Sequence, residues 1–319
     1  MIAIPISIPP DIPPLMQTTP VTPADLSRSV IAVPPLARDR NWKFHRGENE
    51  KIVRHIEAGG VDILLYGGNA NFYHTAPSEY EQILGELSSI AAPETLVIPS
   101  VGPAYGTMMD QAEIIRGTAY PTVMVLPHQG LTTSEGVVRG LTRFAERIGR
   151  PIVVYIKYGD YLTVEGTKQL VDAGLVSWIK YAIVRENPSK DPYLSRLVDL
   201  VDPRLIVSGI GEQPVIEHLV DFHVNGFTAG CVCVRPDLSD RLLKAVQSGD
   251  LDLARRIQAI FKPLEDLRNG IHPVRVLHEA VRLAGIADTG PALPLLSGVT
   301  PDEESAILSA VEALKIATL

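Results

Sequence analysis

Residues 151–181 read PIVVYIKYGDYLTVEGTKQLVDAGLVSWIKY and hold one complete copy of the pattern that decides the fold. The stretch opens with an apolar, β-branched run, and its middle part, TVEGTKQLVDAG, has apolar residues at helical spacing. It closes with a second apolar run, VSWIKY. A threonine near a glutamate at the start of the middle part and a glycine at its end are typical helix start and stop signals. The stretch therefore predicts a strand, a helix and a second strand.

The same pattern recurs along most of the chain. Amphipathic helical segments separate eight β-favouring runs: SVIAV near 30, VDILLY near 62, TLVIPSV near 96, TVMVLP near 123, PIVVYI near 152, VSWIKY near 177, RLIVSG near 205 and GFTAGCVCV near 228. Eight alternations favour a (β/α)8 TIM barrel over an open doubly wound sheet, which normally has fewer strands. We expect the barrel to span residues 30–237, with strands buried on both faces.

Two segments flank the predicted barrel. Residues 238–319 contain further amphipathic stretches and predict a C-terminal helical appendage. Residues 1–29 contain seven prolines and predict an extended N-terminal arm. The arm is either a clasp between subunits or a loosely packed leader. It has no basic start and no long apolar region, so we do not expect it to be a secretory signal.

The composition narrows the class of partner. Hydrophobic residues make up 45% of the chain and charged residues 21%, which is typical of a globular protein. The net charge of −8 argues against nucleic acid or an anionic membrane as a partner, and no apolar run is long enough to span a bilayer. Cys231 and Cys233 alternate along the last predicted strand, so a disulfide between them is geometrically poor. We expect a cytoplasmic protein with a small-molecule ligand.

Ligand sites of such barrels lie at the carboxyl ends of the strands. Lys180 follows apolar residues at the end of the sixth predicted strand, where poor solvation lowers the pKa of an amine and makes it nucleophilic. Tyr155, one strand earlier, can face the same interior and relay protons. The alternatives are a surface lysine at a strand end and a packed core aromatic.

Several motifs occur in an order seen in one enzyme family. They are YGGNANFYHTAPSEY from Tyr66, VVYIKY with Tyr155, WIKYA with Lys180, NGIHPVR from Asn269 and LAGIADTGPALPLLSGVTP from Leu283. Together they resemble the dihydrodipicolinate synthase and N-acetylneuraminate lyase family of class I (Schiff-base) aldolases, over roughly residues 30–315. The resemblance implies a (β/α)8 barrel with a C-terminal helical bundle, a homotetramer, and an imine between Lys180 and a 2-oxo acid. It implies no cofactor beyond that lysine.

The loop after the second strand departs from the family pattern. Paired hydroxyls hold the substrate carboxylate there in the family, and one of them belongs to a proton relay; this chain has Gly68 and Asn69 instead. The backbone amides of Gly67, Gly68 and Asn69, with the Asn69 side chain, can still bind a carboxylate. The hydroxyl relay itself is lost.

Two other family positions also differ. The relay tyrosine after the fourth strand falls on His128 or Gln129, and the arginine that meets the synthase's second substrate has no counterpart in KYGDYL. His128 is either an acid and base in place of that tyrosine or a residue that only bonds its own loop. The missing arginine argues against dihydrodipicolinate synthase proper, which stays an alternative.

Other residues at the predicted barrel mouth are open to two interpretations. Lys157 shares a face with Tyr155 and is either a second cation for an acidic substrate or a rim lysine. Tyr73 and His74 either line the pocket or cap the following helix at a subunit boundary. The resemblance places the tail of the 2-oxo acid at the last two strands, against Gly209, Ile210 and Gly230.

Rival functions remain. One rival is a barrel enzyme that binds a sugar phosphate, because barrels often bind phosphate with glycine loops at the last two strands, where this chain has SGIGE and FTAGC. The other is a catalytically inactive binding barrel, which the lost hydroxyl relay suggests. The sequence has no metal-binding spacing and no dinucleotide fingerprint. We predict a Schiff-base-forming lyase, an aldolase or a dehydratase, acting on a 2-oxo acid such as pyruvate or a 2-keto-3-deoxy sugar acid. We expect it to be a homo-oligomer, either a tetramer or a dimer.

Overall fold

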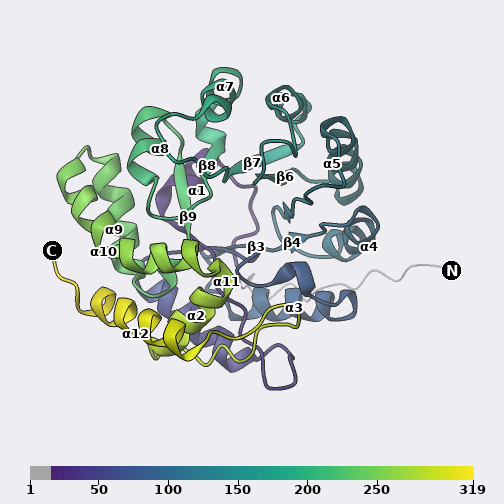
Figure 1. Cartoon of the computed structure of the whole chain (residues 1–319). Helices are drawn as coiled ribbons and strands as arrows, with labels where there is room; N and C mark the ends of the chain where they lie inside the picture. Colours follow the sequence, from purple (N-terminus) through teal and green to yellow (C-terminus); the bar gives the residue numbers. More distant parts are fainter. Residues whose placement is uncertain (1–15) are drawn as a thin grey trace.

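A closed ring of parallel strands forms the centre of the molecule (Figure 1). The structure is a computed structural model that describes residues 16–319. Its strands are β1 (Ile31–Ala32), β2 (Ile63–Leu65), β3 (Leu96–Ile98), β4 (Ser100–Val101), β5 (Met124–Val125), β6 (Ile152–Ile156), β7 (Val176–Tyr181), β8 (Ile206–Ser208) and β9 (Gly226–Ala229). They follow the order β3-β2-β1-β9-β8-β7-β6-β5-β4. The predicted TIM barrel is confirmed.

The ring closes within the third predicted run. β3 pairs with β2, whereas β4 pairs with β5, and the two segments are separated only by Pro99. Proline has no backbone N–H and interrupts the strand there. The nine assigned strands thus correspond to the eight runs of the sequence.

A ring of helices surrounds the strands (Figure 1). Its members are α2 (Arg46–Ala58), α3 (Pro77–Ile90), α4 (Tyr105–Arg116), α5 (Ser134–Ile148), α6 (Val164–Asp172), α7 (Pro192–Leu200), α8 (Val215–Asp221) and α9 (Pro236–Gln247). Helix α9 contacts both α8 and α2, so it belongs to the ring although it begins near the predicted end of the barrel. The strands are almost entirely buried, because their β-branched residues face the helices on one side and the barrel interior on the other.

Three more helices come after the ring: α10 (Leu251–Gly270), α11 (Pro273–Leu283) and α12 (Pro301–Ile316). They match the helical appendage expected from the sequence, and α10 contacts α9, α11 and α12. In Figure 1, α11 lies across the front of the barrel. The exact division into arm, barrel and appendage stays a prediction. No helix within residues 16–319 is long and apolar enough to cross a membrane.

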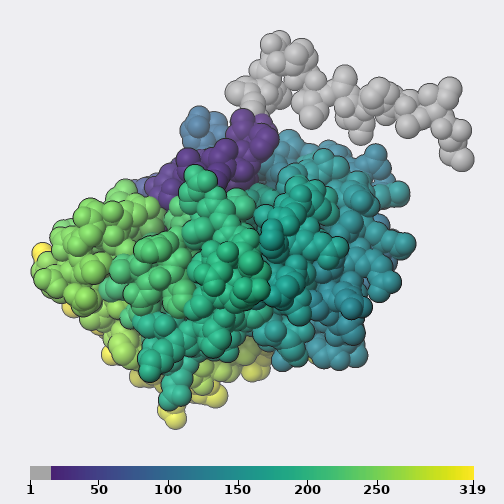
Figure 2. Space-filling view, turned by 90° about the horizontal axis from the view of Figure 1, so that it is seen from above, coloured from purple at the N-terminus to yellow at the C-terminus, as the bar shows by residue number. Residues whose placement is uncertain are grey.

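The predicted arm is only partly extended. Residues 1–15 lie outside the described residues, but α1 (Pro23–Arg28) is a helix that begins with a capping box between Thr22 and Asp25. Leu26 is fully buried, and Asn225, just before β9, donates a hydrogen bond of 2.6 Å to the Pro23 carbonyl. Helix α1 therefore packs at the amino ends of the strands. Figure 2 shows the purple N-terminal segment along one edge, with the yellow C-terminal residues mainly along the opposite edge.

The prediction for the two cysteines was wrong in its geometry. The last strand ends at Ala229, and Cys231 and Cys233 lie on a short 3₁₀ helix, η3 (Cys231–Cys233), not on alternating faces of a strand. Both thiols are free and buried.

We expect Leu26→Ala to lower the free energy of unfolding by about 2–5 kcal/mol, because it leaves a cavity beneath the barrel. Chemical denaturation measures the change. Leu308→Ala is the matched control, since Leu308 is 37% exposed on α12, and it should cost less than about 1 kcal/mol. Equal losses for the two variants would contradict the packing role of α1.

Candidate active site

Lys180 lies near the carboxyl end of β7, and its side chain is buried in the barrel mouth. The residue is 6% exposed, and its Nζ lies 4.6 Å from the centre of the Tyr155 ring. The strand register explains this contact, because Tyr155 on β6 pairs directly with Lys180 on β7. Side chains paired in this way point to the same face of a sheet. The structure thus brings together the two residues expected to act as a pair.

The surroundings of Lys180 favour the uncharged amine. Burial, and to a smaller extent the positive charges of Lys157 and Arg268, together lower the pKa of Lys180 from its ordinary value of 10.5 to about 7. A substantial fraction of the amine is therefore a free nucleophile at neutral pH. Burial raises the pKa of Tyr155, so its phenol keeps its proton and can donate it.

A cavity of about 400 Å³ opens above the amine. Nine of the residues predicted for the site line it: Lys180, Tyr155, Gly67, Gly68, Asn69, Lys157, Gly209, Ile210 and Gly230. Tyr73 and His74 line it as well, so their pocket-lining interpretation agrees with the structure. Helix α3 begins after Ala76 without a side-chain cap, so neither residue caps it.

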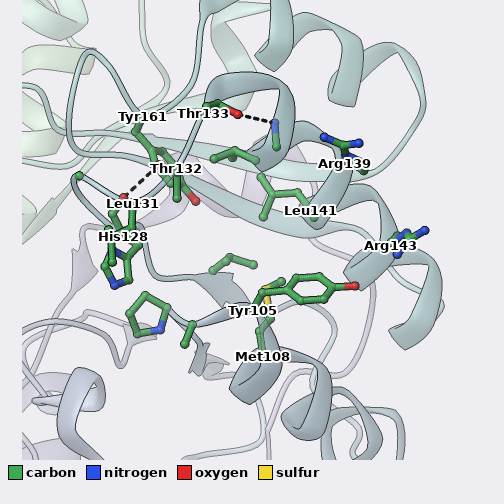
Figure 3. Close-up of a pocket in the computed structure, with 17 residues that line it drawn as sticks. Tyr105, Met108, His128, Leu131, Thr132, Thr133, Arg139, Leu141, Arg143 and Tyr161 are labelled. Atoms are coloured by element: carbon green, nitrogen blue, oxygen red, sulfur yellow. Dashed lines mark hydrogen bonds between the residues drawn. The ribbon is translucent and has the colours of Figure 1, made fainter.

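The structure does not bring His128 or Gln129 to this cavity. His128 lines a separate cavity of about 710 Å³ between α4 and α5, shown in Figure 3, and its Nδ1 lies 3.1 Å from the carbonyl of the exposed Gln129. Tyr73 lines the Lys180 cavity, and its hydroxyl donates a hydrogen bond of 3.3 Å to the carbonyl of Pro127, the residue before His128. A role for His128 in place of the relay tyrosine stays a prediction, and its position outside the Lys180 cavity does not support it.

The loop after β2 lines the cavity with Gly67, Gly68 and Asn69. A Cβ on Gly67 would lie 2.6 Å from the end of the Met124 side chain, so a larger residue there would require Met124 to shift. Within residues 16–319, the N–H groups of Gly68 and Asn69 donate no hydrogen bond to the chain. The Asn69 side chain, in contrast, donates to the Val33 carbonyl at 3.1 Å. The backbone is therefore a better candidate than that side chain for the predicted carboxylate binding.

The C-terminal helices contribute residues that the sequence pattern did not predict. Arg268 and Asn269, near the end of α10, and His272, just before α11, all line the cavity. Asn269 and His272 belong to the segment NGIHPVR, which is one of the motifs of the family resemblance. The sequence did not predict that this segment lies over the barrel, because its position depends on how α10 packs. Arg268 is 6% exposed and forms an ion pair of 2.5 Å with Glu265.

The glycines at the ends of β8 and β9 make room for charged side chains. A Cβ on Gly209 would lie 2.8 Å from Lys180 Cγ, and a Cβ on Gly230 would lie 2.7 Å from the guanidinium carbon of Arg268. Gly211 has a φ of +132°, and its Cβ would meet Glu265 at 2.2 Å. The two glycine motifs that suggested a phosphate site thus have a packing role around Lys180, Glu265 and Arg268.

Three buried groups beside the cavity have the spacing of metal ligands. Possible ligand atoms of Glu212, Cys231 and Glu265 lie within 4.8 Å of one another. Arg268 already pairs with Glu265, and the Cys231 thiol donates to Glu265 at 3.3 Å. Burial raises the pKa of Cys231 and of Glu212, which favours their protonated forms, whereas metal ligation requires the deprotonated forms. We interpret this group as the support of Arg268 rather than as a metal site.

Comparisons with known proteins agree with this geometry. No family model matches the chain. A probable 5-dehydro-4-deoxyglucarate dehydratase of Rhizobium rhizogenes is 23% identical over 318 residues, covering 93% of this chain and 100% of that protein. A 4-hydroxy-tetrahydrodipicolinate synthase of Archaeoglobus fulgidus is 25% identical over 254 residues, covering 74% of this chain and 81% of that protein.

Solved structures share the fold over nearly the whole chain. Dihydrodipicolinate synthase from Bacillus clausii superposes with a TM-score of 0.78 at 20% identity, covering 92% of this chain and 99% of that one. The enzyme from Agrobacterium tumefaciens gives a TM-score of 0.79 at 16% identity, covering 92% and 100%. At these identities the structural likeness shows the fold alone.

We expect Lys180→Met to stabilise the fold most at low pH. The unfolded chain restores the lysine pKa to near 10.5, so the unfolded state binds more protons between pH 7 and 10. The lysine therefore destabilises the fold by roughly 4 kcal/mol below pH 7, and this cost shrinks as the pH rises. Urea unfolding measures the free energy of unfolding of the variant and of the parent protein. The difference between the two should fall by about half from pH 6.5 to pH 9.

Lys168→Met is the control for this measurement, because Lys168 is exposed on α6. Its effect on the free energy of unfolding should not change across the same range. A pH-independent effect of Lys180→Met would mean that the amine is solvated.

Proposed function

We propose, from the premise that this chain is a divergent member of the dihydrodipicolinate synthase family, that it is a lyase which forms a Schiff base with a 2-oxo acid at Lys180. One observation carries the proposal. The Lys180 amine is buried in the barrel mouth, 4.6 Å from the centre of the Tyr155 ring, and has a pKa of about 7.

The first steps depend on these two side chains. The neutral amine of Lys180 attacks the C2 carbonyl of the substrate, the carbonyl oxygen takes up a proton, and the nitrogen, which the attack has made an ammonium, gives one up, so that a neutral carbinolamine forms. A second proton then goes to that hydroxyl, water leaves, and the nitrogen lone pair forms the C=N bond of a positively charged iminium. The protonated phenol of Tyr155 lies beside the amine and is the group that we assign to these proton transfers.

The carboxylate next to C2 needs a fixed position for this attack. We assign it to the free N–H groups of Gly68 and Asn69, since an amide pair in a glycine turn binds an anion without a charged side chain. The Asn69 carbonyl lies 2.9 Å from His278 Nε2, which holds the loop in place. A substrate bound in this way presents its C2 to Lys180.

The iminium draws electrons from C3, which permits retro-aldol cleavage, condensation or dehydration. We favour dehydration of a deoxy sugar acid, because the relative that covers 93% of this chain is named a probable 5-dehydro-4-deoxyglucarate dehydratase. The synthase reaction is the second candidate, supported by the Archaeoglobus relative. In its disfavour, segment 157–162 contains no arginine, and Gly159 and Asp160 do not line the described cavity.

Trapping with borohydride tests the imine. We expect the protein incubated with pyruvate and borohydride to gain the mass of the reduced adduct, located on Lys180 by peptide mapping. Lys180→Met should give no adduct, because the nucleophile is lost. An adduct located on Lys157, or no adduct with any of a panel of 2-oxo acids, would contradict the assignment; an adduct without turnover of sugar acids would favour the inactive binding barrel.

We expect Tyr155→Phe to slow imine formation by about 10² or more, because the ring still covers the amine but the proton donor is missing. Stopped-flow absorbance with pyruvate, or timed borohydride quenching, measures the rate. Tyr105→Phe removes a phenol that is 47% exposed outside the cavity, and it serves as the control. An unchanged rate in Tyr155→Phe would remove Tyr155 from the mechanism.

A further inference from the structure

The Lys180 cavity offers several groups that can carry a proton, but no carboxylate. Apart from Lys180 and Arg268, the titratable side chains among the described lining residues are Lys157, His74, His272, Tyr73 and Tyr155. None of the described lining residues is Asp or Glu. Dehydration, the reaction that we favour, needs an acid, because hydroxide is a poor leaving group unless it takes up a proton as its C–O bond breaks. One of these side chains has to supply that proton.

Lys157 comes directly after β6 and shares a face with Tyr155. Side chains two residues apart along an extended chain point to the same face, and each residue adds about 3.3 Å. The backbone of Lys157 therefore lies roughly 7 Å further toward the barrel mouth than that of Tyr155. A substrate held by Lys180 extends in this direction into the cavity, which brings its C4 within reach of the Lys157 side chain.

The Lys157 ammonium lies close to the reacting amine. Its positive charge contributes to the lowered pKa of both Lys180 and His272, which puts the ammonium near each of them. Its Nζ lies 5.4 Å from the centre of the Tyr158 ring, and an aromatic face attracts a cation without accepting its proton. Neither this ring nor a lining carboxylate takes the proton of Lys157, which leaves it available to a substrate.

The other titratable side chains fit the role of the acid less well. His272 Nδ1 accepts a hydrogen bond of 3.3 Å from the first turn of α11, and burial lowers the pKa of this imidazole. The neutral ring would have to become an imidazolate to give up its remaining proton. Burial raises the pKa of Tyr73, whose hydroxyl already donates to the Pro127 carbonyl. His74 follows the loop after β2, where we assign the carboxylate beside C2, so it lies nearer to C1 than to C4.

We propose that Lys157 is a second catalytic lysine, which protonates the hydroxyl group that leaves C4 during dehydration. The iminium at Lys180 first gives up a C3 proton, which Tyr155 passes to water, and becomes a neutral enamine. The nitrogen lone pair then forms the C=N bond again, the C2=C3 electrons form a C3=C4 double bond, and the C4–O bond breaks. The departing hydroxide takes a proton from the Lys157 ammonium and leaves as water. The inference rests on the proposed function, since it takes the imine and the dehydration as given.

This step moves a positive charge instead of creating one. Before the elimination Lys157 is positive and the enamine is neutral, whereas afterwards Lys157 is neutral and the iminium is positive. The charge in the cavity therefore stays constant while the C–O bond breaks, which matters where no lining carboxylate balances a second cation. Because Lys157 is exposed, its amine regains a proton from water for the next turnover.

Two leaving groups that differ in their need for a proton test this role. The probes are a 2-keto-3-deoxy sugar acid and its analogue with fluorine in place of the C4 hydroxyl, since fluoride leaves without being protonated. Both give the same unsaturated product, which mass spectrometry quantifies. We expect Lys157→Met to slow the loss of water by about 10² or more and the loss of fluoride by less than about tenfold. The ratio of the two rates cancels any change in the reactivity of Lys180, whose pKa depends on the charge of Lys157.

Two further variants separate proton transfer from charge. Lys157→Arg keeps the positive charge, but a guanidinium does not give up a proton in proteins, so the ratio of water loss to fluoride loss should fall as far as in Lys157→Met. Lys168→Met, on the surface of α6, should leave the ratio at its parental value.

The outcomes separate the two proposals. If the parent protein gives no borohydride adduct with pyruvate or with either probe, the Schiff-base function fails. If the parent protein gives the adduct but removes water from no 4-hydroxy acid, or if Lys157→Met or Lys157→Arg keeps the parental ratio, the imine stands and the role of Lys157 is overturned. Thermal unfolding of each variant, together with pyruvate trapping at Lys180, confirms that the variant is folded and that its amine still reacts.

Discussion

The dry environment of one amine is the constraint on which the site depends. Lys180 sits in a ring of strands that closes across Pro99, and both faces of those strands are apolar, so water is excluded beneath the amine. Burial disfavours the charged form, and the nearby cations Lys157 and Arg268 act in the same direction. The register between β6 and β7 then places Tyr155 against the amine. Closure of the barrel thus positions both the amine that we propose as nucleophile and the phenol that we propose as its proton donor.

The barrel mouth accommodates buried charge because glycine occupies the positions of closest approach. An added Cβ would meet the Lys180 stem at Gly209, the Arg268 guanidinium at Gly230 and the Glu265 carboxylate at Gly211. A larger residue at any of these positions would therefore require a charged side chain to shift. Glycine at the ends of β8 and β9 leaves room for the side chains that reach the barrel mouth from β7 and α10.

Local periodicity in the sequence was enough to predict the barrel, because eight apolar runs predicted its strands. It placed Tyr155 and Lys180 at strand ends but left open a surface lysine and a packed aromatic, and the family resemblance selected the pair that the strand register brings together. The contribution of Arg268 was not predictable, because it depends on how a helix far along the chain packs over the barrel. The position of His128 in a different cavity from Lys180 was not predictable for a similar reason, because it depends on how the loop after β5 packs. Helix α1 was not predicted, because the prolines around it suggest an extended chain.

In the proposed reaction, charge links the amine to the rest of the cavity. A pKa of about 7 leaves part of the Lys180 amine neutral at neutral pH, whereas the iminium would carry a full positive charge at the same atom, near Lys157. Tyr155 does not supply the opposing charge, because burial keeps its phenol protonated, and the described lining residues include no Asp or Glu. Arg268 is already paired with Glu265, so the carboxylate beside C2 is the group that we expect to balance the iminium. The acidity of the substrate is then part of what makes the proposed chemistry possible.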